Sequence, residues 1–411
     1  MKLGFNAHHL SNPALNGWNR YSVNLIAQLA SSGIQIILYG KKPFYDGHLR
    51  RIGEACEVRT APRMPNLIYE QVWLARQCQK DQLDVFHSPF NSGLPWFARC
   101  ATVLNIHDVI DEKLYDRVAW RMRWSSMASF RDARIYIVWR KDRAREHIYQ
   151  RISRARADKI ITGSQHAKAD IIDSFRIPAE RVSVIHHAAD SIFSPPVSDE
   201  ERRRVRDRYG LCCPYVFYVG SHQERKNVPF LIRAFADAKL RDVQLAVGGD
   251  PSHHGVPELV AALALTDQVK CLGEIPDRDL PALYAEAACF VYPSKYEGFG
   301  LQLCEAMAGG CPTLAADATS LPEVLGQGGL TFPLDSVSPL VELIHRIIDE
   351  PSFAQALRLR AHERSRHFSW KKCAEETINV YQAAMQAHLE RHKRRRSPRM
   401  QTRPCAPRSR Q

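Results

Sequence analysis

Short β-rich runs alternate with longer amphipathic stretches along this chain, and the alternation occurs twice. In the first half the strand candidates are KLGFNA, IQIILYG, DVFHS, TVLNIHD, KIITGS and VSVIHH. In the second half they are YVFYVG, QLAVGG, VKCLG, CFVYPS and PTLAAD. Apolar strands that alternate with helices form parallel sheets covered on both faces. The sequence therefore predicts an α/β chain with two doubly wound, Rossmann-like parallel-sheet domains that face a cleft.

A turn-rich segment, FSPPVSDEE, is the predicted linker between these two units. It divides the chain into an N-terminal domain at 1–195 and a C-terminal domain at 196–370. We expect a helix over 371–390, followed by a disordered basic tail at 391–411. In doubly wound sheets, ligands bind beyond the carboxyl ends of the strands, where loops lead into helices.

The net charge of +13 is concentrated in two segments. Residues 391–411 hold nine Lys and Arg and no acidic residue, whereas residues 117–156 hold twelve against three acidic residues. These two segments account for more than the whole excess, so the rest of the chain is mildly acidic. This distribution argues against a basic nucleic-acid-binding surface.

The segment 117–156 interleaves its arginines with five aromatic residues: Trp120, Trp124, Phe130, Tyr136 and Trp139. That composition is typical of a helix on an anionic membrane surface, or of a mouth for a lipid-diphosphate acceptor. A pair of solvated helices beside the acceptor site explains it equally well. The tail at 391–411 is interpreted as a solvated or lipid-attracted appendage.

Targeting signals and cysteine usage favour the cytoplasm. The N-terminal stretch MKLGFNAHHL has no apolar core of a signal peptide, and no run approaches the roughly twenty apolar residues of a membrane span. The eleven cysteines are scattered and form no C-x-x-C pair, which favours free thiols over disulfides or zinc. We expect a cytoplasmic protein that is at most peripheral on the cytoplasmic face of a membrane.

The segment PSKYEGFGLQLCEAMAGGCP at 293–312 runs from a strand through a glycine-containing loop into a helix. Gly298 and Gly300 allow the backbone to approach a ligand closely, and the helix that begins near Leu301 offers unpaired N–H groups to an anion.

Two glutamates flank this loop. Glu297 stands at its start, and Glu305 lies eight residues later inside the helix. Because carboxylates beside a phosphate are repulsive, both are predicted to accept hydrogen bonds from sugar hydroxyls. The alternative is an ordinary strand–loop–helix with two solvated glutamates.

A second strand–loop–helix lies at 218–235. Its strand ends at Gly220, its loop carries Arg225 and Lys226, and a helix follows Asn227. Two adjacent cations before a helix N-terminus make a strong anion site. A solvated basic pair is the alternative.

Together these two segments resemble the family 4 glycosyltransferases, which are retaining enzymes of the GT-B fold. Glu297 and Glu305 reproduce the E-x7-E motif of that family, and GSHQERKN resembles its basic diphosphate loop. LPEV at 321–324, ADKIITGSQHAKADI at 157–171 and the closing FSWKKCAEETINVYQAA are also similar to family segments. The resemblance covers nearly the whole chain and implies C-terminal helices that cross back to the N-terminal domain.

The resemblance also implies roles for individual residues. Arg225 and Lys226 would hold the donor diphosphate and stabilise the leaving nucleotide. Glu297 would bond hydroxyls of the transferred sugar, and Glu305 those of the ribose. The base would lie near the loop from Gly273 to Ile275. The remaining expected donor contacts come largely from backbone, at Gly17, Gly220, Ser221, Gly273, Glu274, Ile275, Gly298, Phe299, Gly300 and Leu301.

In the N-terminal half, the family loop often written G-x-G-R-Y corresponds to Gly17, Trp18, Asn19, Arg20 and Tyr21. Asn19 replaces the second glycine, and Asn tolerates left-handed backbone better than most residues.

Three other polar residues of this half end strands or close turns. His107, in NIHDVI, resembles the active-site histidine that lies near the transferred sugar, with a structural histidine as the alternative. His87, in FHSP, has the same two interpretations. Asp190, which closes the turn HHAAD, is interpreted as structural.

Asp277-Arg278-Asp279 has the D-x-D spelling of metal-dependent transferases. It precedes the apparent helix DLPALYAEA, where Asp is a common N-cap, so the cap is the preferred interpretation. No metal or other cofactor is expected, since Arg225, Lys226 and a helix N-terminus can neutralise the leaving diphosphate.

The function that the resemblance implies is retaining transfer of a hexose from a nucleotide sugar to a glycan or lipid-linked acceptor, in the synthesis of surface polysaccharide. GSHQERKN is similar to mannosyl- and rhamnosyl-type members, which favours mannose from GDP-mannose. The alternatives are a nucleotide-sugar epimerase or a phosphorylase of the same fold, and a catalytically inactive nucleotide-sugar-binding protein. A nucleic-acid-binding protein ranks below these.

Overall fold

The N-terminal part of the molecule is built on a seven-stranded sheet with the strand order β3-β2-β1-β4-β5-β6-β7. The computed structural model describes residues 1–13, 17–53, 55–110, 113, 145–194, 196–250 and 255–396. The strands are β1 (Lys2–Asn6), β2 (Gln35–Gly40), β3 (Cys56–Thr60), β4 (Val85–Ser88), β5 (Ala101–Asn105), β6 (Lys159–Thr162) and β7 (Val182–Val184). Each neighbouring pair is parallel.

The C-terminal part contains a six-stranded sheet with the order β10-β9-β8-β11-β12-β13. Its strands are β8 (Tyr215–Val219), β9 (Gln244–Gly248), β10 (Val269–Gly273), β11 (Cys289–Tyr292), β12 (Thr313–Ala316) and β13 (Leu330–Phe332). They too pair in parallel.

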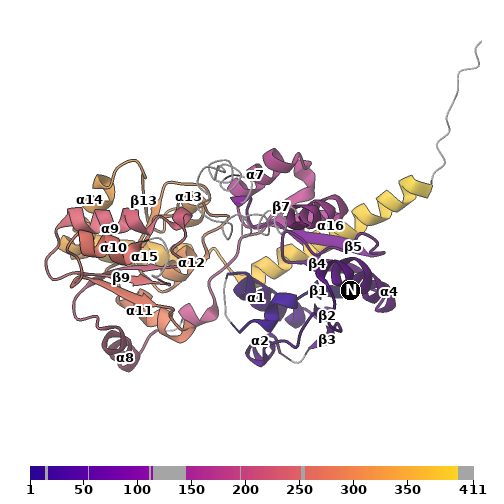
Figure 1. The fold of residues 1–411 in the computed structure, drawn as a ribbon, viewed down its shortest axis with the longest axis horizontal. Helices are drawn as coiled ribbons and strands as arrows, with labels where there is room; N and C mark the ends of the chain where they lie inside the picture. Colours follow the sequence, from indigo (N-terminus) through magenta and orange to yellow (C-terminus); the bar gives the residue numbers. More distant parts are fainter. Residues whose placement is uncertain are drawn as a thin grey trace, which may run out of the picture.

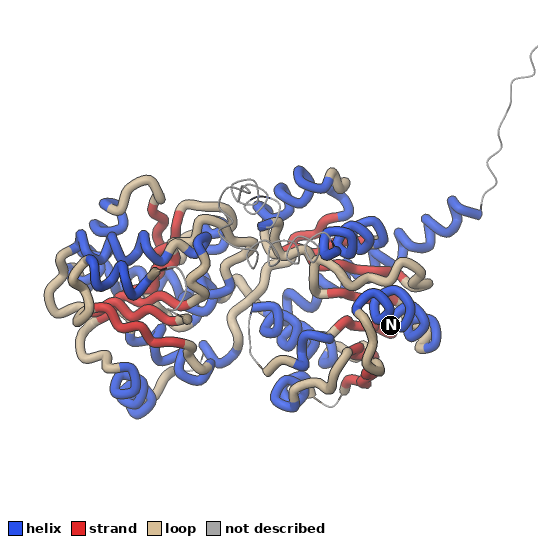
Figure 2. Tube along the Cα trace, viewed as in Figure 1, coloured by secondary structure: helices blue, strands red, loops and turns tan. Residues whose placement is uncertain are grey.

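Helices connect the strands of both sheets and flank them, as Figures 1 and 2 show. In the N-terminal part these are α1 (Gly17–Ser31), α2 (Asp46–Ile52), α3 (Asn66–Ile68), α4 (Leu74–Lys80) and α7 (Gln165–Phe175). The C-terminal part has α8 (Asp199–Tyr209), α9 (Val228–Ala238), α10 (Val256–Ala262), α11 (Leu280–Glu286), α12 (Leu301–Ala308), α13 (Leu321–Leu325), α14 (Ser338–Asp349) and α15 (Pro351–Ser365). The predicted α/β class with two doubly wound domains is confirmed.

The strand order reverses once in each sheet, between β1 and β4 and between β8 and β11. At such a point the loops diverge to opposite faces and leave a crevice at the carboxyl ends of the strands. Every strand predicted from the sequence is present. Two further strands, β3 and β13, were missed: β3 carries exposed and charged residues at a sheet edge, and β13 has only three residues.

The last helix, α16 (Trp370–Arg396), returns from the C-terminal domain and packs on the N-terminal one. In Figure 1 it is the yellow helix that runs across β5 and β4. It contacts α1, β4, β5 and β6, and the Tyr381 hydroxyl lies 2.7 Å from Nδ1 of His87. The crossing predicted for 371–390 is therefore present. The prediction of a disordered tail from 391 onward is wrong for 391–396, which continue the helix.

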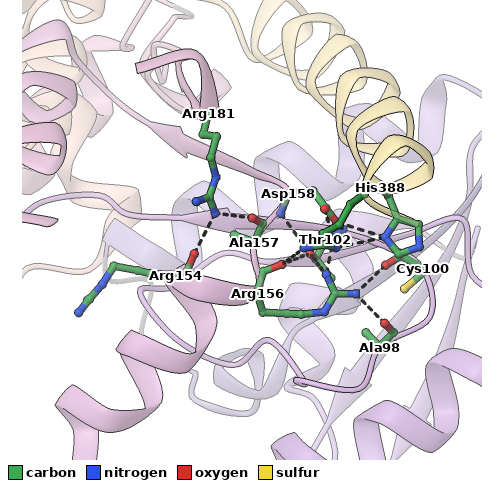
Figure 3. Close-up of polar contacts among 10 residues, drawn as sticks. Ala98, Cys100, Thr102, Arg154, Arg156, Ala157, Asp158, Arg181 and His388 are labelled. Atoms are coloured by element: carbon green, nitrogen blue, oxygen red, sulfur yellow. Dashed lines mark hydrogen bonds and ion pairs between the residues drawn. The ribbon is translucent and has the colours of Figure 1, made fainter. Parts of the chain in front are cut away.

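A buried carboxylate holds the far end of α16 against the sheet (Figure 3). Asp158 accepts from the Thr102 backbone N–H at 2.9 Å and pairs with Arg391 at 2.6 Å and with His388 at 3.5 Å. Burial by itself would raise the pKa of Asp158, but His388, Arg391 and Arg156 hold it below the ordinary value. The end of this helix is thus fixed by an ionised group with several partners.

Contacts between the two domains cluster at the loop after β11. The Ser164 hydroxyl, at the N-terminus of α7, donates to the Gly298 carbonyl at 2.7 Å. Glu323 of α13 accepts from the Gln165 backbone N–H at 2.9 Å. Tyr296 donates to Asp170 at 2.5 Å. Loops from opposite sheets therefore meet directly.

Within the described ranges, no helix combines the length and apolar composition that a bilayer crossing requires. Most of the basic aromatic segment 117–156 lies outside the described residues, and so does the tail beyond 396. The membrane and solvated interpretations of that segment both stay as stated above.

We predict that Gly298→Ala destabilises the contact between the domains. A Cβ at Gly298 would stand 2.0 Å from the His107 carbonyl oxygen and 2.9 Å from Cβ of Asp108. Overpacking of this kind costs about 1–3 kcal/mol, measured as the free energy of unfolding in urea. Gly17→Ala is the control, because nothing lies within 4 Å of its Cβ position. It should leave stability unchanged or slightly higher, since Ala favours helix. Equal stabilities of the two variants would contradict the prediction.

Candidate functional site

The loop between β11 and α12 is held in place by two hydroxyl side chains from the start of α13. The Glu297 backbone N–H donates to Oγ1 of Thr319 at 3.0 Å. The Ser320 hydroxyl lies 2.9 Å from the Glu297 carbonyl oxygen and 3.1 Å from that of Phe299. Gly300 ends the loop at φ +93° as the N-cap of α12, a conformation that suits glycine. The loop is therefore positioned before any ligand arrives.

The Glu297 side chain pairs with both Arg225 and Lys226, which lie on the loop after β8. Its Oε1 is 2.6 Å from Nζ of Lys226 and 3.1 Å from a guanidinium nitrogen of Arg225. Burial alone would raise the pKa of Glu297, but Lys226 and Arg225 outweigh it and hold that pKa below the ordinary value. Glu297 is an ionised, buried carboxylate with two basic partners. The alternatives of solvated glutamates and a solvated basic pair do not describe these residues.

Further bonds join the loop after β8 to the loop after β11. The Lys295 backbone N–H donates to the Arg225 carbonyl at 2.7 Å. Lys226 also donates to the Tyr292 hydroxyl at 2.6 Å. Asn227, at φ +56°, turns the chain from the cations into α9. Two adjacent strand ends thus supply one compact cluster of charge.

Glu305 has a different partner, Arg20, which the sequence did not predict. It is buried on α12, where it accepts from the Tyr284 hydroxyl at 3.3 Å and lies 3.4 Å from Nε of Arg20. Burial raises the pKa of Glu305 above the ordinary value, although Arg20 opposes this shift. Arg20 also pairs with Asp277 at 2.7 Å. Residues 17–21, which the sequence predicted as a glycine-rich loop, form the start of helix α1 instead, and Arg20 on that helix reaches the C-terminal domain.

The D-x-D spelling separates into two unrelated contacts. Asp277 faces Arg20, whereas Asp279 is buried and pairs with Arg204 at 2.8 Å and with the Tyr209 hydroxyl at 2.9 Å. Asp279 takes the N-cap position of α11 that the sequence predicted, but its side chain makes no capping bond to that helix. In the part of the chain that the structure describes, no three His, Cys, Asp or Glu side chains gather as a metal site.

Three glycines bring the loops after β8, β9 and β10 into mutual contact. A Cβ at Gly249 would meet the Gly220 carbonyl oxygen at 2.0 Å, and the Gly249 N–H donates to the Gly273 carbonyl at 2.8 Å. Ile275 packs against Gly248, and Glu274 is exposed. The carbonyl of Ser221 accepts from the Tyr218 hydroxyl at 2.8 Å. The predicted base and phosphate loops are neighbours at one end of the sheet.

His107 lies opposite this cluster on the N-terminal side. Its Nε2 is 3.0 Å from the Pro89 carbonyl oxygen, so that nitrogen carries the proton. Burial lowers the pKa of His107 to about 4, and the ring is neutral at neutral pH. Its carbonyl oxygen is the atom that packs on Gly298. His107 therefore meets the loop after β11 through its backbone, while its ring packs on Tyr21 and His187.

Two other polar residues of the N-terminal half have structural partners. His87 is buried, with Nε2 2.6 Å from Oδ1 of Asn105 and Nδ1 facing the Tyr381 hydroxyl. Asp190 caps a short helix by accepting from the Ile192 N–H at 3.2 Å and pairs with Arg51.

The remaining expected donor residues differ in their exposure. Phe299 packs on His187, with ring centroids 4.8 Å apart, and lies in the domain interface. Leu301 is half-buried at the start of α12. Gly17 is exposed at the start of α1, with open space around it.

A cavity of about 760 Å³ opens beside this cluster, mainly on the N-terminal side. Trp18 and Phe90 supply aromatic walls, Glu70 and Asn91 supply polar groups, and Arg225 joins it to the charged cluster. Glu70 is buried, and its Oε2 has no hydrogen-bond partner among the described residues. Burial raises the pKa of Glu70 to about 7. The cavity thus contains a buried carboxyl group that can bond a ligand.

We predict that Glu70 makes stability fall as pH rises. Below the ordinary carboxyl pKa of 4.5 both states are protonated; between 4.5 and about 7 only the folded state keeps the proton. Stability is therefore lost across that window and stays low above it. Between pH 4.5 and 7 the wild-type protein should lose about 2–3 kcal/mol more than Glu70→Gln. Urea unfolding at several pH values measures this difference, and parallel pH profiles would disprove it.

Comparison with known proteins agrees with this geometry. A family model described as Glycosyltransferase Family 4 matches residues 15–193, and one described as Glycosyl transferases group 1 matches residues 212–367. The O-antigen chain mannosyltransferase B of Escherichia coli is 34% identical over 231 residues, which span 55% of this chain and 60% of that protein. The D-inositol 3-phosphate glycosyltransferase of Corynebacterium aurimucosum is 25% identical over 403 residues, which span 91% and 92%.

Solved structures support the same fold. The crystal structure of Anabaena Alr3699/HepE in complex with UDP and glucose matches with a TM-score of 0.71, over 93% of this chain and 100% of that one. At 19% identity this likeness concerns the fold alone. The two family models together match every strand except β1. One includes Arg20 and His107, and the other includes Arg225, Lys226, Glu297 and Glu305. This chain therefore belongs to the family 4 glycosyltransferases and has the GT-B fold.

Proposed function

We propose that the protein transfers a hexose from a nucleotide sugar to a glycan or lipid-linked acceptor, with retention at the anomeric carbon. The observation that carries this proposal is the buried cluster of Glu297, Arg225 and Lys226. It lies where the strand order of the C-terminal sheet reverses, and the next residue, Gly298, packs on the His107 carbonyl of the other domain. A paired carboxylate and two cations at this place suit a ligand with both hydroxyls and phosphates.

In this proposal the donor diphosphate binds to Arg225 and Lys226. In the structure both cations pair with Glu297. Their Coulomb attraction for a diphosphate is strong because water is largely excluded. As the bond from the sugar to the diphosphate breaks, negative charge develops on the departing phosphate. Cations that are already in place stabilise that charge without reorganisation. This is the reason to propose a reaction that needs no metal ion.

The sugar and the ribose are assigned to the two glutamates. Glu297 remains ionised and can accept hydrogen bonds from sugar hydroxyls, which also draws the sugar toward the cations. Glu305 would accept from the ribose, while Arg20 limits its negative charge from the N-terminal side. The acceptor hydroxyl then attacks from the cavity lined by Trp18 and Glu70. The departing phosphate oxygen takes the acceptor proton.

Mannose from GDP-mannose is the proposed donor, and the proposed role is the synthesis of surface polysaccharide. The support is the printed name of the Escherichia coli relative, an O-antigen chain mannosyltransferase. A second relative, from Mycolicibacterium hassiacum, is named an MMP alpha-(1->4)-mannosyltransferase and is 31% identical over 260 residues. A cytoplasmic location, in which the ten described free cysteines stay reduced, is part of the same proposal.

Donor identity is tested by thermal shift with GDP-mannose, UDP-glucose and dTDP-rhamnose, followed by assay of transfer and of donor hydrolysis. We expect the largest stabilisation with GDP-mannose, because a ligand that binds the folded state alone raises its stability by mass action. Binding without turnover, with any acceptor offered, would instead identify a nucleotide-sugar-binding protein. Interconversion of the sugar without transfer would identify an epimerase. Proton NMR of the product reports the anomeric configuration.

Lys226→Ala should lower turnover at saturating donor by about 100- to 1000-fold, the usual cost of removing one preorganised charge. Lys226 is buried against Glu297, so circular dichroism must first show an intact fold. Arg241→Ala, which removes an exposed cation from the same domain, is the matched control and should retain wild-type turnover. Near-wild-type turnover in Lys226→Ala would refute the assignment.

A further inference from the structure

The cavity of about 760 Å³ beside the donor cluster combines aromatic rings with polar side chains. Trp18 and Phe90 line it together with the amide side chain of Asn91. Arg225, which pairs with Glu297, lines the same cavity and joins it to the donor cluster. A molecule that fills this cavity therefore stands next to the site proposed for transfer.

Trp18 is an aromatic ring that is both fixed and uncovered. Its ring packs on Phe90, with centroids 5.7 Å apart and planes inclined at 71°, yet Trp18 is 53% exposed. Phe90 is buried and packs in turn on the ring of His9, at a centroid distance of 4.4 Å. The Trp18 ring thus offers an apolar surface to a ligand. The C–H face of a pyranose is apolar too, so stacking of the two would remove both from water.

Glu70 supplies a polar group in the same cavity. It lies in a π-helical turn, Tyr69–Trp73, between α3 and α4, and such turns are rare and frequently occur at functional sites. The Tyr69 ring stacks on that of Trp73 with centroids 5.5 Å apart, which holds the turn in place. Glu70 is 8% exposed, and its Oε2 has no hydrogen-bond partner among the described residues. A ligand hydroxyl that bonds this oxygen would recover the free energy lost by its burial.

The charge of the cavity does not favour a phosphate. Its described lining contains three acidic residues, Glu70, Asp108 and Glu146, and two arginines, Arg145 and Arg225. Arg225 is already paired with Glu297. Recognition of a phosphate by protein side chains relies on charge-assisted bonds from basic groups. The described lining has no excess of basic groups to provide them.

The two histidines of the lining add no positive charge. Burial, together with Lys41, lowers the pKa of His8 to about 4, and burial lowers the pKa of His9 well below its ordinary value. Nδ1 of His8 lies 3.0 Å from Oδ1 of Asn6, and Nε2 of His9 lies 2.8 Å from the Ser22 hydroxyl. Both rings are therefore neutral at neutral pH and do not attract an anion.

We propose that the acceptor presents an uncharged pyranose to this cavity, with its apolar face on the Trp18 ring and one hydroxyl bonded to Glu70. This inference rests on the transfer reaction proposed above and narrows its acceptor to a sugar without a phosphate at the receiving end. A free glycan and a lipid-linked one can both carry such a terminal sugar. Trp18 and Glu70 would then determine the specificity for the acceptor.

The experiment is saturation-transfer NMR of the full chain with soluble acceptor analogues. The neutral probes are methyl α-D-mannopyranoside, methyl α-D-glucopyranoside and methyl β-D-galactopyranoside, and the charged probes are mannose 6-phosphate and inositol 1-phosphate. The charged probes are included because the N-terminus of α1, at Trp18, would suit an anion. We expect at least one neutral pyranoside to bind about tenfold more tightly than either charged probe, since like charges oppose binding of the latter.

Variants of the two residues test their roles. Glu70→Ala should weaken binding of the preferred pyranoside by at least about tenfold, and Glu70→Gln, which keeps one acceptor oxygen, should lie between it and the wild type. Trp18→Ala should weaken binding by about 3- to 10-fold, and Trp18→Phe should recover part of the loss. Thermal unfolding in the presence and absence of the donor checks the fold and the donor site of each variant.

The matched controls are Glu180→Ala and Trp96→Ala. They remove an exposed carboxylate and an exposed tryptophan of the same domain that do not line the cavity. Both should bind the pyranoside as the wild type does.

The proposal is overturned if no neutral pyranoside binds, if a charged probe binds more tightly, or if Glu70→Ala and Trp18→Ala bind as the wild type does. Binding of a pyranoside that depends on Glu70, without transfer from any nucleotide sugar, would support this inference and contradict the proposed function. The two proposals can therefore fail separately.

Discussion

The ionised carboxylate of Glu297 between Lys226 and Arg225 is the interaction on which the donor side of the structure depends. Three charges have been removed from water there, and burial of ions is recovered only where partners and hydrogen bonds are complete. The Tyr292 hydroxyl accepts a further hydrogen bond from Lys226, and the Tyr296 carbonyl accepts one from Arg225. Because the partners come from the ends of β8 and β11, the pair also fixes the distance between these two loops. The same residues thus hold these two loops in place and present their charge.

This arrangement ties the donor site to the domain interface within three consecutive residues. Glu297 faces the cations, Gly298 packs on the His107 carbonyl, and Phe299 packs on His187. A shift of this loop that changed the ion pairs of Glu297 would also change the packing between the domains, and the reverse is equally true. Arg20 adds a second link, since it joins helix α1 to Glu305 and Asp277. Donor contacts and the approach of the two domains are therefore coupled through packing.

The sequence predicted those features that depend on local pattern and on sheet topology. Strand–helix alternation predicted the two sheets, and the family resemblance implied that Arg225, Lys226 and Glu297 bind one donor, although their ion pairs were not predicted. It missed the contact of Arg20 with Glu305, because the two residues are distant in sequence and no periodicity links them. The edge strand β3 was missed because charged residues replace the apolar pattern there. Asp279 takes the predicted N-cap position, but its side chain pairs with Arg204 of α8, which the local sequence did not indicate.

The positive charge at the donor cluster is only partly balanced. Arg225 and Lys226 share the single carboxylate of Glu297, so two basic side chains face one acidic one. Arg20 pairs with Asp277 and lies beside Glu305, whose pKa burial raises. We infer that the donor is selected by short-range contacts, since the cations must exchange part of their bonding to Glu297 for a diphosphate.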